Sequence, residues 1–175
     1  MATLTATSAK EPFYLTDEHK DFIGKIMNPW MFRYFLLRKV PLGLLAGMKL
    51  KYLDMHRCEA TIPYRWITTN PFKSAYFAAL AMAAELSNGS LALLAVYKCN
   101  PSVAVIIVGM EAEFIKKATS LTTFTCEDGD KLLAAVERAQ KTGESVTQKV
   151  QTIGRAEDGS EVAKFTFTWS FKKRG

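Results

Sequence analysis

The sequence predicts an α+β domain in which one curved antiparallel sheet wraps around a single central helix. Residues 68–89, TTNPFKSAYFAALAMAAELSNG, are rich in alanine, and small side chains allow a helix to lie very close to a sheet. The last strand-like segment alternates apolar and polar residues, which gives it one core face and one wet face. Other strand-like segments follow one another in a meander, so a single sheet is expected.

The N-terminal part is predicted to be helical. Residues 1–12 are small, polar and unpatterned, which predicts disorder. Thr16 is a candidate N-cap because acidic residues follow it, and the Asn-Pro pair at residues 28–29 is expected to end that helix. Residues 30–40 predict a second short helix, and residues 41–47 a turn. We therefore divide the chain into a helical extension, 1–46, and a main domain, 47–175.

Strands are expected from Met48 onward. Residues 48–55 and 57–64 indicate a hairpin-like pair, and the alanine-rich helix follows them. That helix is expected to end at residues 87–89, Ser-Asn-Gly. The apolar segment 90–99 follows the helix. Residues 102–114 are apolar on both faces, which predicts a central buried strand.

The chain ends with a strand, a helix and a hairpin. The predicted ranges are 119–126 for the strand, 127–143 for the helix, and 144–155 and 160–172 for the hairpin. Asp128 is expected to cap the helix and Gly143 to stop it. The side chains of the last strand expected to face the core are Ala163, Phe165, Phe167, Trp169 and Phe171.

Composition narrows the function classes. The 175 residues suit one domain, and no secretory leader or membrane-length apolar run is evident. Three scattered cysteines and two histidines predict a reduced, cytoplasmic chain without a metal centre. The net charge of +6 favours anionic partners such as coenzyme A or an acidic membrane, or simply keeps the protein soluble. No basic run with interleaved aromatics suggests nucleic-acid binding.

Three stretches together resemble the hotdog-fold, thioesterase-like superfamily. They are NPFKSAYFAALAMAAE at 70–85, EAEFIKKATSL at 111–121 and EDGSEVAKFTFTW at 157–169, and the resemblance spans about residues 47–172. The closest branch has a helical N-terminal extension, and its members are mostly described as thioesterases or as a domain of unknown function.

The resemblance implies a curved sheet around a central helix and a homodimer or dimer of dimers. It also implies an acyl-thioester site at the subunit interface, near the start of the central helix, with no cofactor beyond the coenzyme A of the substrate. In such enzymes a backbone N–H at the helix N-terminus polarises the thioester carbonyl. An acid about two turns further along acts as base or nucleophile.

The carry-over to this sequence is partial. Lys73, Ser74 and Ala75 stand where the family has a His-Gly-Gly turn, so the resemblance makes the Ser74 N–H the oxyanion donor and Ala75 a point of close approach. The position two turns on is Met82, which has no acidic group and is suited to line an acyl chain. Glu85 follows one turn later on the same helical stripe.

The nearest acid therefore has two interpretations. Glu85 is either a displaced catalytic acid, with a pKa raised by burial, or a structural carboxylate near the helix end. Asn70 either caps the helix or donates to a bound acyl group or water. Ser74 as a nucleophile has no evident base partner.

Two further segments are candidates for binding phosphate or a membrane surface. Lys116 and Lys117 follow the predicted strand 102–114, where they would either bind coenzyme A phosphates or be solvated. The apolar segment 30–48, which also carries basic residues, would either cover the sheet or lie on a membrane surface. The resemblance therefore implies an acyl-CoA or acyl-carrier-protein thioesterase, with a non-catalytic acyl-thioester or lipid-binding protein as the alternative.

Overall fold

The computed structural model describes residues 15–175, so the disorder predicted for residues 1–12 lies outside the described part. The helices are α1 (Asp17–Met27), α2 (Pro29–Lys39), α3 (Pro41–Ala46), the 3₁₀ turn η1 (Trp66–Thr68), α4 (Phe77–Val96) and α5 (Gly129–Thr142). The strands are β1 (Lys49–Leu53), β2 (Cys58–Ile62), β3 (Val103–Phe114), β4 (Thr122–Cys126), β5 (Val146–Arg155) and β6 (Glu161–Lys173).

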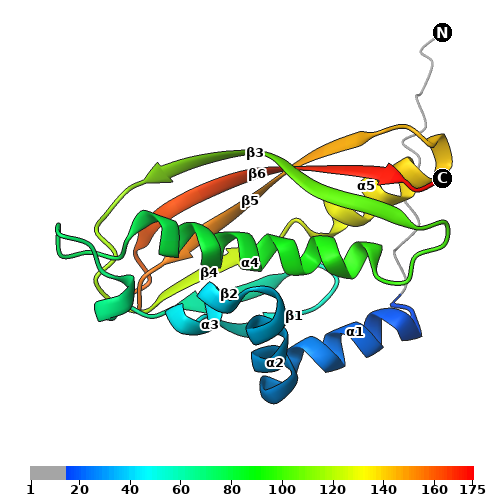
Figure 1. The fold of residues 1–175 in the computed structure, drawn as a ribbon. Helices are drawn as coiled ribbons and strands as arrows, with labels where there is room; N and C mark the ends of the chain where they lie inside the picture. Colours follow the sequence, from blue (N-terminus) through cyan, green and yellow to red (C-terminus); the bar gives the residue numbers. More distant parts are fainter. Residues whose placement is uncertain (1–14) are drawn as a thin grey trace, which may run out of the picture.

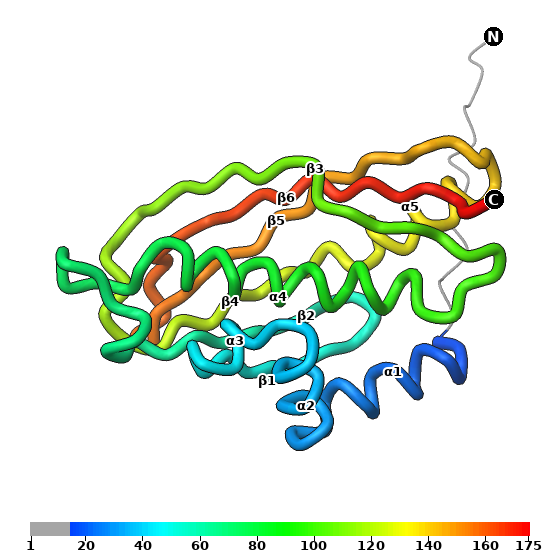
Figure 2. The backbone as a smooth tube through the Cα atoms, viewed as in Figure 1, coloured from blue at the N-terminus to red at the C-terminus, as the bar shows by residue number. Residues whose placement is uncertain are grey.

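The six strands form one antiparallel sheet in the order β1-β2-β4-β5-β6-β3. The sheet curls around α4, with α1, α2 and α3 on the side of β1 and β3 on the opposite side of α4 (Figure 1). The chain path in Figure 2 shows α5 beside the end of β6, near the C-terminus. This confirms the predicted α+β class and the sheet wrapped around a central helix.

The last strand supplies the centre of the core. The alternating residues of β6 predicted to face inward, Ala163, Phe165, Phe167, Trp169 and Phe171, are all buried. Small residues of α4 face them, and Ala83, Ala84 and Ala92 are fully buried. This pairing of bulky strand residues with a slim helix is what allows the sheet to curve closely around α4.

α4 is longer than the sequence pattern predicts. It continues through residues 87–89 to Val96, so residues 90–96 are helical. The Ser87 hydroxyl and the Asn88 amide both donate to the carbonyl oxygen of Ala84, each at 2.7 Å, so these side chains bond within the helix instead of ending it. In the described residues α4 alone is long and apolar enough to span a membrane. Of its apolar 18-residue stretch, 72% is buried inside the fold.

Asn88 also makes a tertiary hydrogen bond that fixes this part of the helix. Its side-chain oxygen accepts the indole N–H of Trp169 at 2.8 Å, and both residues are buried. We expect Asn88→Ala to lower the free energy of unfolding by about 2 kcal/mol, because the buried indole N–H then lacks a partner. Urea unfolding of the two proteins measures this, and an unchanged midpoint would contradict it.

Residues 102–114 do not form a central strand. Within residues 15–175, β3 pairs with β6 on one side only, so it is an edge of the sheet, and Ile106, Val108 and Met110 are half to two-thirds exposed. The predicted burial was wrong, because apolar residues on both faces of a strand do not show whether other elements lie against it. An apolar edge strand of twelve residues is a surface on which another chain can pair.

The N-terminal region is helical up to Ala46, and it packs against the core. The turn predicted for residues 41–47 is wrong for most of its length, because α3 occupies Pro41–Ala46 and the chain turns only at Gly47, whose φ is 77°. The predicted N-cap is confirmed, since Thr16 accepts the N–H of His19 at 3.3 Å. Phe32, Leu36 and Ala46 of this region are buried in the core.

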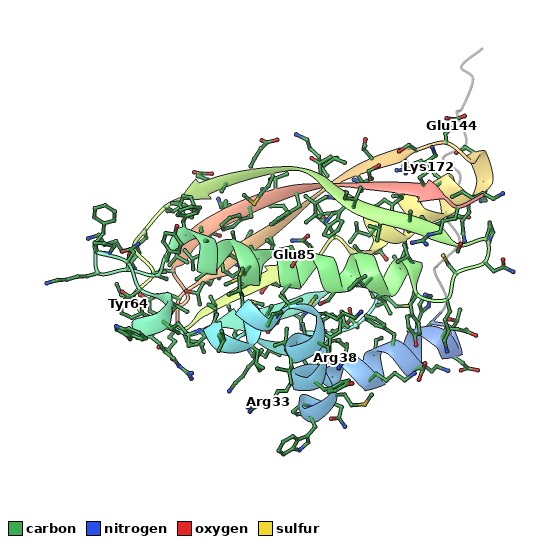
Figure 3. The ribbon with its side chains drawn as sticks, viewed as in Figure 1. Arg33, Arg38, Tyr64, Glu85, Glu144 and Lys172 are labelled. Carbon is green, nitrogen blue, oxygen red and sulfur yellow. The ribbon has the colours of Figure 1, made fainter. Side chains whose placement is uncertain are left out.

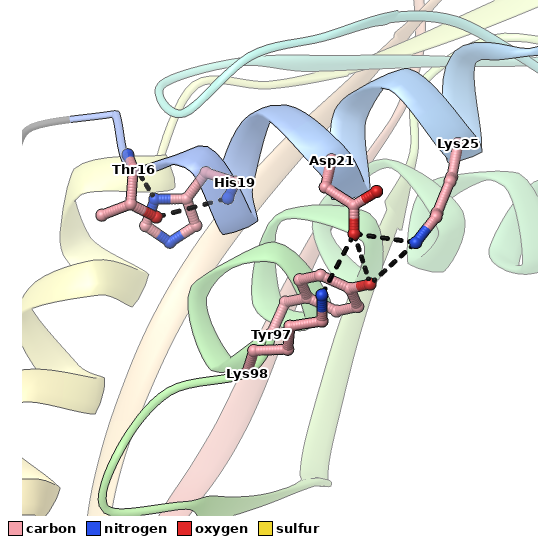
Figure 4. Close-up of polar contacts among 6 residues, drawn as sticks. All are labelled: Thr16, His19, Asp21, Lys25, Tyr97 and Lys98. Carbon is pink, nitrogen blue, oxygen red and sulfur yellow. Dashed lines mark hydrogen bonds and ion pairs between the residues drawn. The ribbon is translucent and has the colours of Figure 1, made fainter.

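A carboxylate fastens α1 to the end of α4. Asp21 accepts hydrogen bonds from Lys25, Tyr97 and Lys98 at 2.7, 3.0 and 3.3 Å (Figure 4). The Lys25 bond first, and then the Tyr97 bond, lower the pKa of Asp21 to about 2. α1 is therefore held against the C-terminal end of α4.

Candidate active site

A groove of about 660 Å³ opens at the N-terminal end of α4. One wall is the loop that precedes the helix, and the other is the end of β3 with the four residues that follow it. The groove contains five of the eight residues that the sequence singled out, namely Asn70, Ser74, Ala75, Lys116 and Lys117. Apolar side chains that the sequence did not single out complete it, including Phe72, Phe77, Leu80 and Phe114.

The loop wall is organised by one amide. The side-chain oxygen of Asn70 accepts from the N–H of Phe72 at 3.0 Å and from both the N–H and the hydroxyl of Ser74 at 3.3 Å. The Asn70 amide nitrogen donates to the Ala75 carbonyl at 3.3 Å. Asn70 does not cap α4, because the N-cap position is Tyr76. Its amide instead holds the loop in shape.

The free backbone donors at the start of α4 differ from the donor that the resemblance implies. The Ser74 N–H is directed to Asn70, and the Ala75 N–H donates to the Ala118 carbonyl at 2.7 Å. Among residues 15–175, the N–H groups of Phe77 and Ala78, the first two of α4, donate no hydrogen bond, and Phe77 lines the groove. The helix dipole adds to these two donors, so this end of α4 is suited to an oxyanion.

The three lysines near the groove are differently placed. Lys117 donates to the Phe72 carbonyl at 3.0 Å and so joins the two walls of the groove. Lys116 donates to Ser160 at 2.8 Å and approaches Asp158 at 3.4 Å, in the β5–β6 turn. Lys73 does not line the groove, and it stands at the tip of the loop with a φ of 56°. Lys116 and Lys117 make the rim of the groove cationic.

Glu85 lies in the middle of α4, not near its end. Its label in Figure 3 marks the centre of the helix. Burial raises the pKa of its carboxyl, and no hydrogen bond or ion pair to it occurs in the described residues. One carboxylate oxygen would lie 2.5 Å from a β-carbon at Gly89, so the missing side chain there leaves room for the acid. A half-buried carboxylate with a raised pKa and no partner in the described residues is a candidate general base.

Within one chain, Glu85 is not part of the groove. It lines a separate small cavity of about 80 Å³ with Phe22, Phe35 and Leu93. Glu85 lies eight positions after Phe77, which corresponds to a rise of about 12 Å along the helix axis. Met82 packs against the core between the two sites. A single water molecule cannot connect Glu85 with the groove of its own chain.

The buried carboxyl predicts a specific dependence of stability on pH. A carboxyl whose pKa is higher in the folded state lowers stability as the pH rises through the unfolded and then the folded pKa. We expect Glu85→Gln to raise the free energy of unfolding by about 1 kcal/mol at neutral pH and to leave it unchanged near pH 4, where the acid is already protonated. Urea unfolding at both pH values measures this, and an equal gain at both would contradict it.

The apolar faces around Glu85 are incompletely covered. Ala78, Ala81, Met82 and Glu85 form a partly exposed stripe along α4. The inward-facing Met110 and Phe114 of β3 are about half exposed beside it. The sequence could not identify this surface, because its residues are the same types as those in the core.

Comparisons with known proteins agree with this fold. A family profile described as a domain of unknown function (DUF4442) matches residues 28–171. A probable thioesterase of unknown function from Pseudomonas aeruginosa is similar in structure, with a TM-score of 0.71, 18% identity, and coverage of 86% of this chain and 100% of that one. A thioesterase from Haemophilus influenzae has a TM-score of 0.56 and 16% identity, with 94% of each chain covered. No curated protein sequence matches, and the structural likeness shows that this chain has the hotdog fold.

Proposed function

We propose that this chain, a member of the DUF4442 family, is a thioesterase that hydrolyses acyl-CoA or acyl-carrier-protein thioesters, as the descriptions of its structural neighbours suggest. The chain belongs to this family because the match spans residues 28–171. The observation that carries the proposal is the groove at the N-terminus of α4, where apolar walls and a cationic rim lie at the end of the helix that begins with two free N–H groups. These are the features that an acyl thioester with a phosphate-bearing carrier would need.

Different groups in the groove would bind the carbonyl, the acyl chain and the carrier of such a substrate. The thioester carbonyl would accept the N–H groups of Phe77 and Ala78. The acyl chain would lie against Leu80 and Phe114, and Lys116 or Lys117 would approach the carrier's phosphates. The two lysines already have protein partners, so phosphate binding at them requires those bonds to be exchanged.

The acid would come from a second copy of the chain. In the described residues β3 is an apolar edge of the sheet with no strand on its outer side. Its side chains are partly exposed, and so is the neighbouring stripe of α4 that contains Glu85. Pairing two β3 edges about a two-fold axis would set two α4 helices antiparallel. The carboxylate at the middle of one helix would then lie towards the groove at the start of the other. This homodimer supplies what one chain lacks, a base near the oxyanion donors.

The reaction then follows from these groups. The Glu85 carboxylate takes a proton from water while the water oxygen bonds to the thioester carbon. The resulting oxyanion is stabilised by the two N–H groups at the helix N-terminus. When the tetrahedral intermediate collapses, the carbon–sulfur bond breaks, and the protonated Glu85 returns the proton to the leaving thiolate. The products are a free acid and a thiol.

The second candidate is a non-catalytic acyl-thioester-binding protein in the cytoplasm. It is favoured by Met82, since a methionine stands where the family's acid is expected. In that case the groove would bind acyl-CoA, and Glu85 would have no chemical role.

Hydrolysis of a panel of acyl-CoA esters of increasing chain length, followed by thiol release, separates the two candidates. The proposal expects turnover of at least one ester and a higher melting temperature with a non-hydrolysable acyl-CoA analogue. Stabilisation without turnover would favour the binding protein, because a ligand that binds only the folded state stabilises it. Neither stabilisation nor turnover would overturn both candidates.

A further inference from the structure

The outer side of α2 and α3 carries exposed apolar side chains that no other part of the described chain covers. Trp30 is 81% exposed, and Leu42 is 68% exposed. On α2 the exposed residues recur on one side of the helix, while Phe32 and Leu36 on the other side are buried. We call this the α2–α3 surface, made of Trp30, Arg33, Tyr34, Leu37, Arg38, Leu42 and Leu45.

Positive charge is concentrated in the same segment. Residues 28–53 contain five basic residues and no acidic one, so they carry +5 of the chain's net +6. In the described part of the chain, Arg33, Arg38 and Lys39 take part in no ion pair. Arg38 lies 6.0 Å from the centre of the Tyr34 ring instead. Figure 3 shows Arg33 and Arg38 on α2, on the side of the molecule away from β3.

A second exposed aromatic lies on the adjacent turn. η1 contacts α3, and Trp66 and Ile67 on it are 89% and 51% exposed. A cleft of about 560 Å³ joins the two regions, with Arg33, Lys49 and Arg65 among its lining residues. Exposed tryptophan and leucine next to unpaired basic side chains therefore extend across α2, α3 and η1.

We propose that the α2–α3 surface, together with Trp66 and Ile67, docks on an anionic lipid bilayer. Tryptophan and tyrosine favour the headgroup region, leucines enter its apolar border, and arginine and lysine bind anionic headgroups. A second copy of this chain does not fit here, because two such surfaces would repel each other. The surface lies across α4 from the β3 edge, so docking leaves that edge available (Figure 1). This inference does not depend on thioester hydrolysis.

The test uses the full chain with two kinds of vesicle, phosphatidylcholine alone and phosphatidylcholine mixed with phosphatidylglycerol. We expect flotation with the anionic vesicles and much less with the neutral ones. Tryptophan emission adds a local readout, because Trp30 and Trp66 are exposed whereas Trp169 is buried. Their emission should shift to the blue only with anionic vesicles. Absence of binding to anionic vesicles would overturn the proposal.

Two variants and a matched control locate the surface. Replacing Arg33, Arg38 and Lys39 together by Gln should weaken partitioning about 10²-fold. Replacing Trp30 and Leu42 by Ser should also weaken it, while circular dichroism stays unchanged. The control replaces Lys172, Lys173 and Arg174 by Gln, which removes the same charge at the exposed end of β6. Equal losses from the control and the α2 triple variant would show attraction by net charge alone and would overturn the proposal.

Discussion

Replacing Glu85 by Gln is expected to lower kcat for acyl-CoA hydrolysis by about 10²-fold or more, which is the usual contribution of a general base. Gln keeps the shape of the side chain but cannot accept the proton from water. The same change should raise stability at neutral pH, because it removes a buried charge that has no partner. Activity and stability should therefore move in opposite directions. Initial rates at saturating substrate measure the loss.

Controls separate chemistry from shape. Met82→Leu, one turn away on the same stripe, changes packing volume little and should leave kcat within a few-fold of the wild type. Glu85→Asp keeps the acid but shortens its reach, so it should retain more activity than Glu85→Gln. Wild-type rates in Glu85→Gln would show that Glu85 is structural and that the base lies elsewhere.

Replacing Gly129 by Ala is expected to cost about 3 kcal/mol of folding free energy, equivalent to about 6–12 °C in melting temperature. Gly129 begins α5, and its N–H donates to the His56 carbonyl at 3.0 Å. A β-carbon there would overlap the Met55 carbonyl oxygen and lie 2.8 Å from the α-carbon of His56. Both obstacles are backbone, so no side-chain rotation relieves them. The helix or the turn before β2 must shift.

Gly24→Ala provides the matched comparison for this prediction. Gly24 lies within α1, and a β-carbon there would meet no atom within 4 Å. We expect that change to be neutral or to stabilise by up to about 1 kcal/mol, through helix propensity. Thermal unfolding of both variants measures the difference. Similar melting temperatures for the two would contradict the close approach of α5 to Met55.

Local patterns in the sequence were sufficient to predict most of the fold. The alternation in β6 identified its buried face correctly, and Gly143 marked the end of α5, where φ is 73°. The Ser-Asn-Gly sequence at 87–89 misled, because the partner that keeps Asn88 inside the helix is Trp169, which lies far away in the sequence. The position of β3 at the edge depends on strand order, which hydrophobic periodicity does not encode.

The site was predictable only in part. The groove contains Asn70 and Ser74 because they immediately precede α4, and local order is readable from sequence. The sequence also indicated Glu85 as the nearest acid, but one of its two interpretations, a structural carboxylate near the helix end, depended on a helix end that was misplaced. Phe77 and Phe114 escaped notice, since their positions in the groove depend on how the end of β3 meets α4.

The central claim is that one chain supplies the groove and another supplies the acid, and mixing two inactive variants tests it most directly. Glu85→Gln lacks the base, and Asn70→Ala lacks the amide that shapes the groove. After unfolding and joint refolding in equal amounts, half of the dimers should be mixed, each with one intact site. The account predicts recovery of about one quarter of wild-type activity. No recovery, with mixed dimers present by native mass spectrometry, would contradict it.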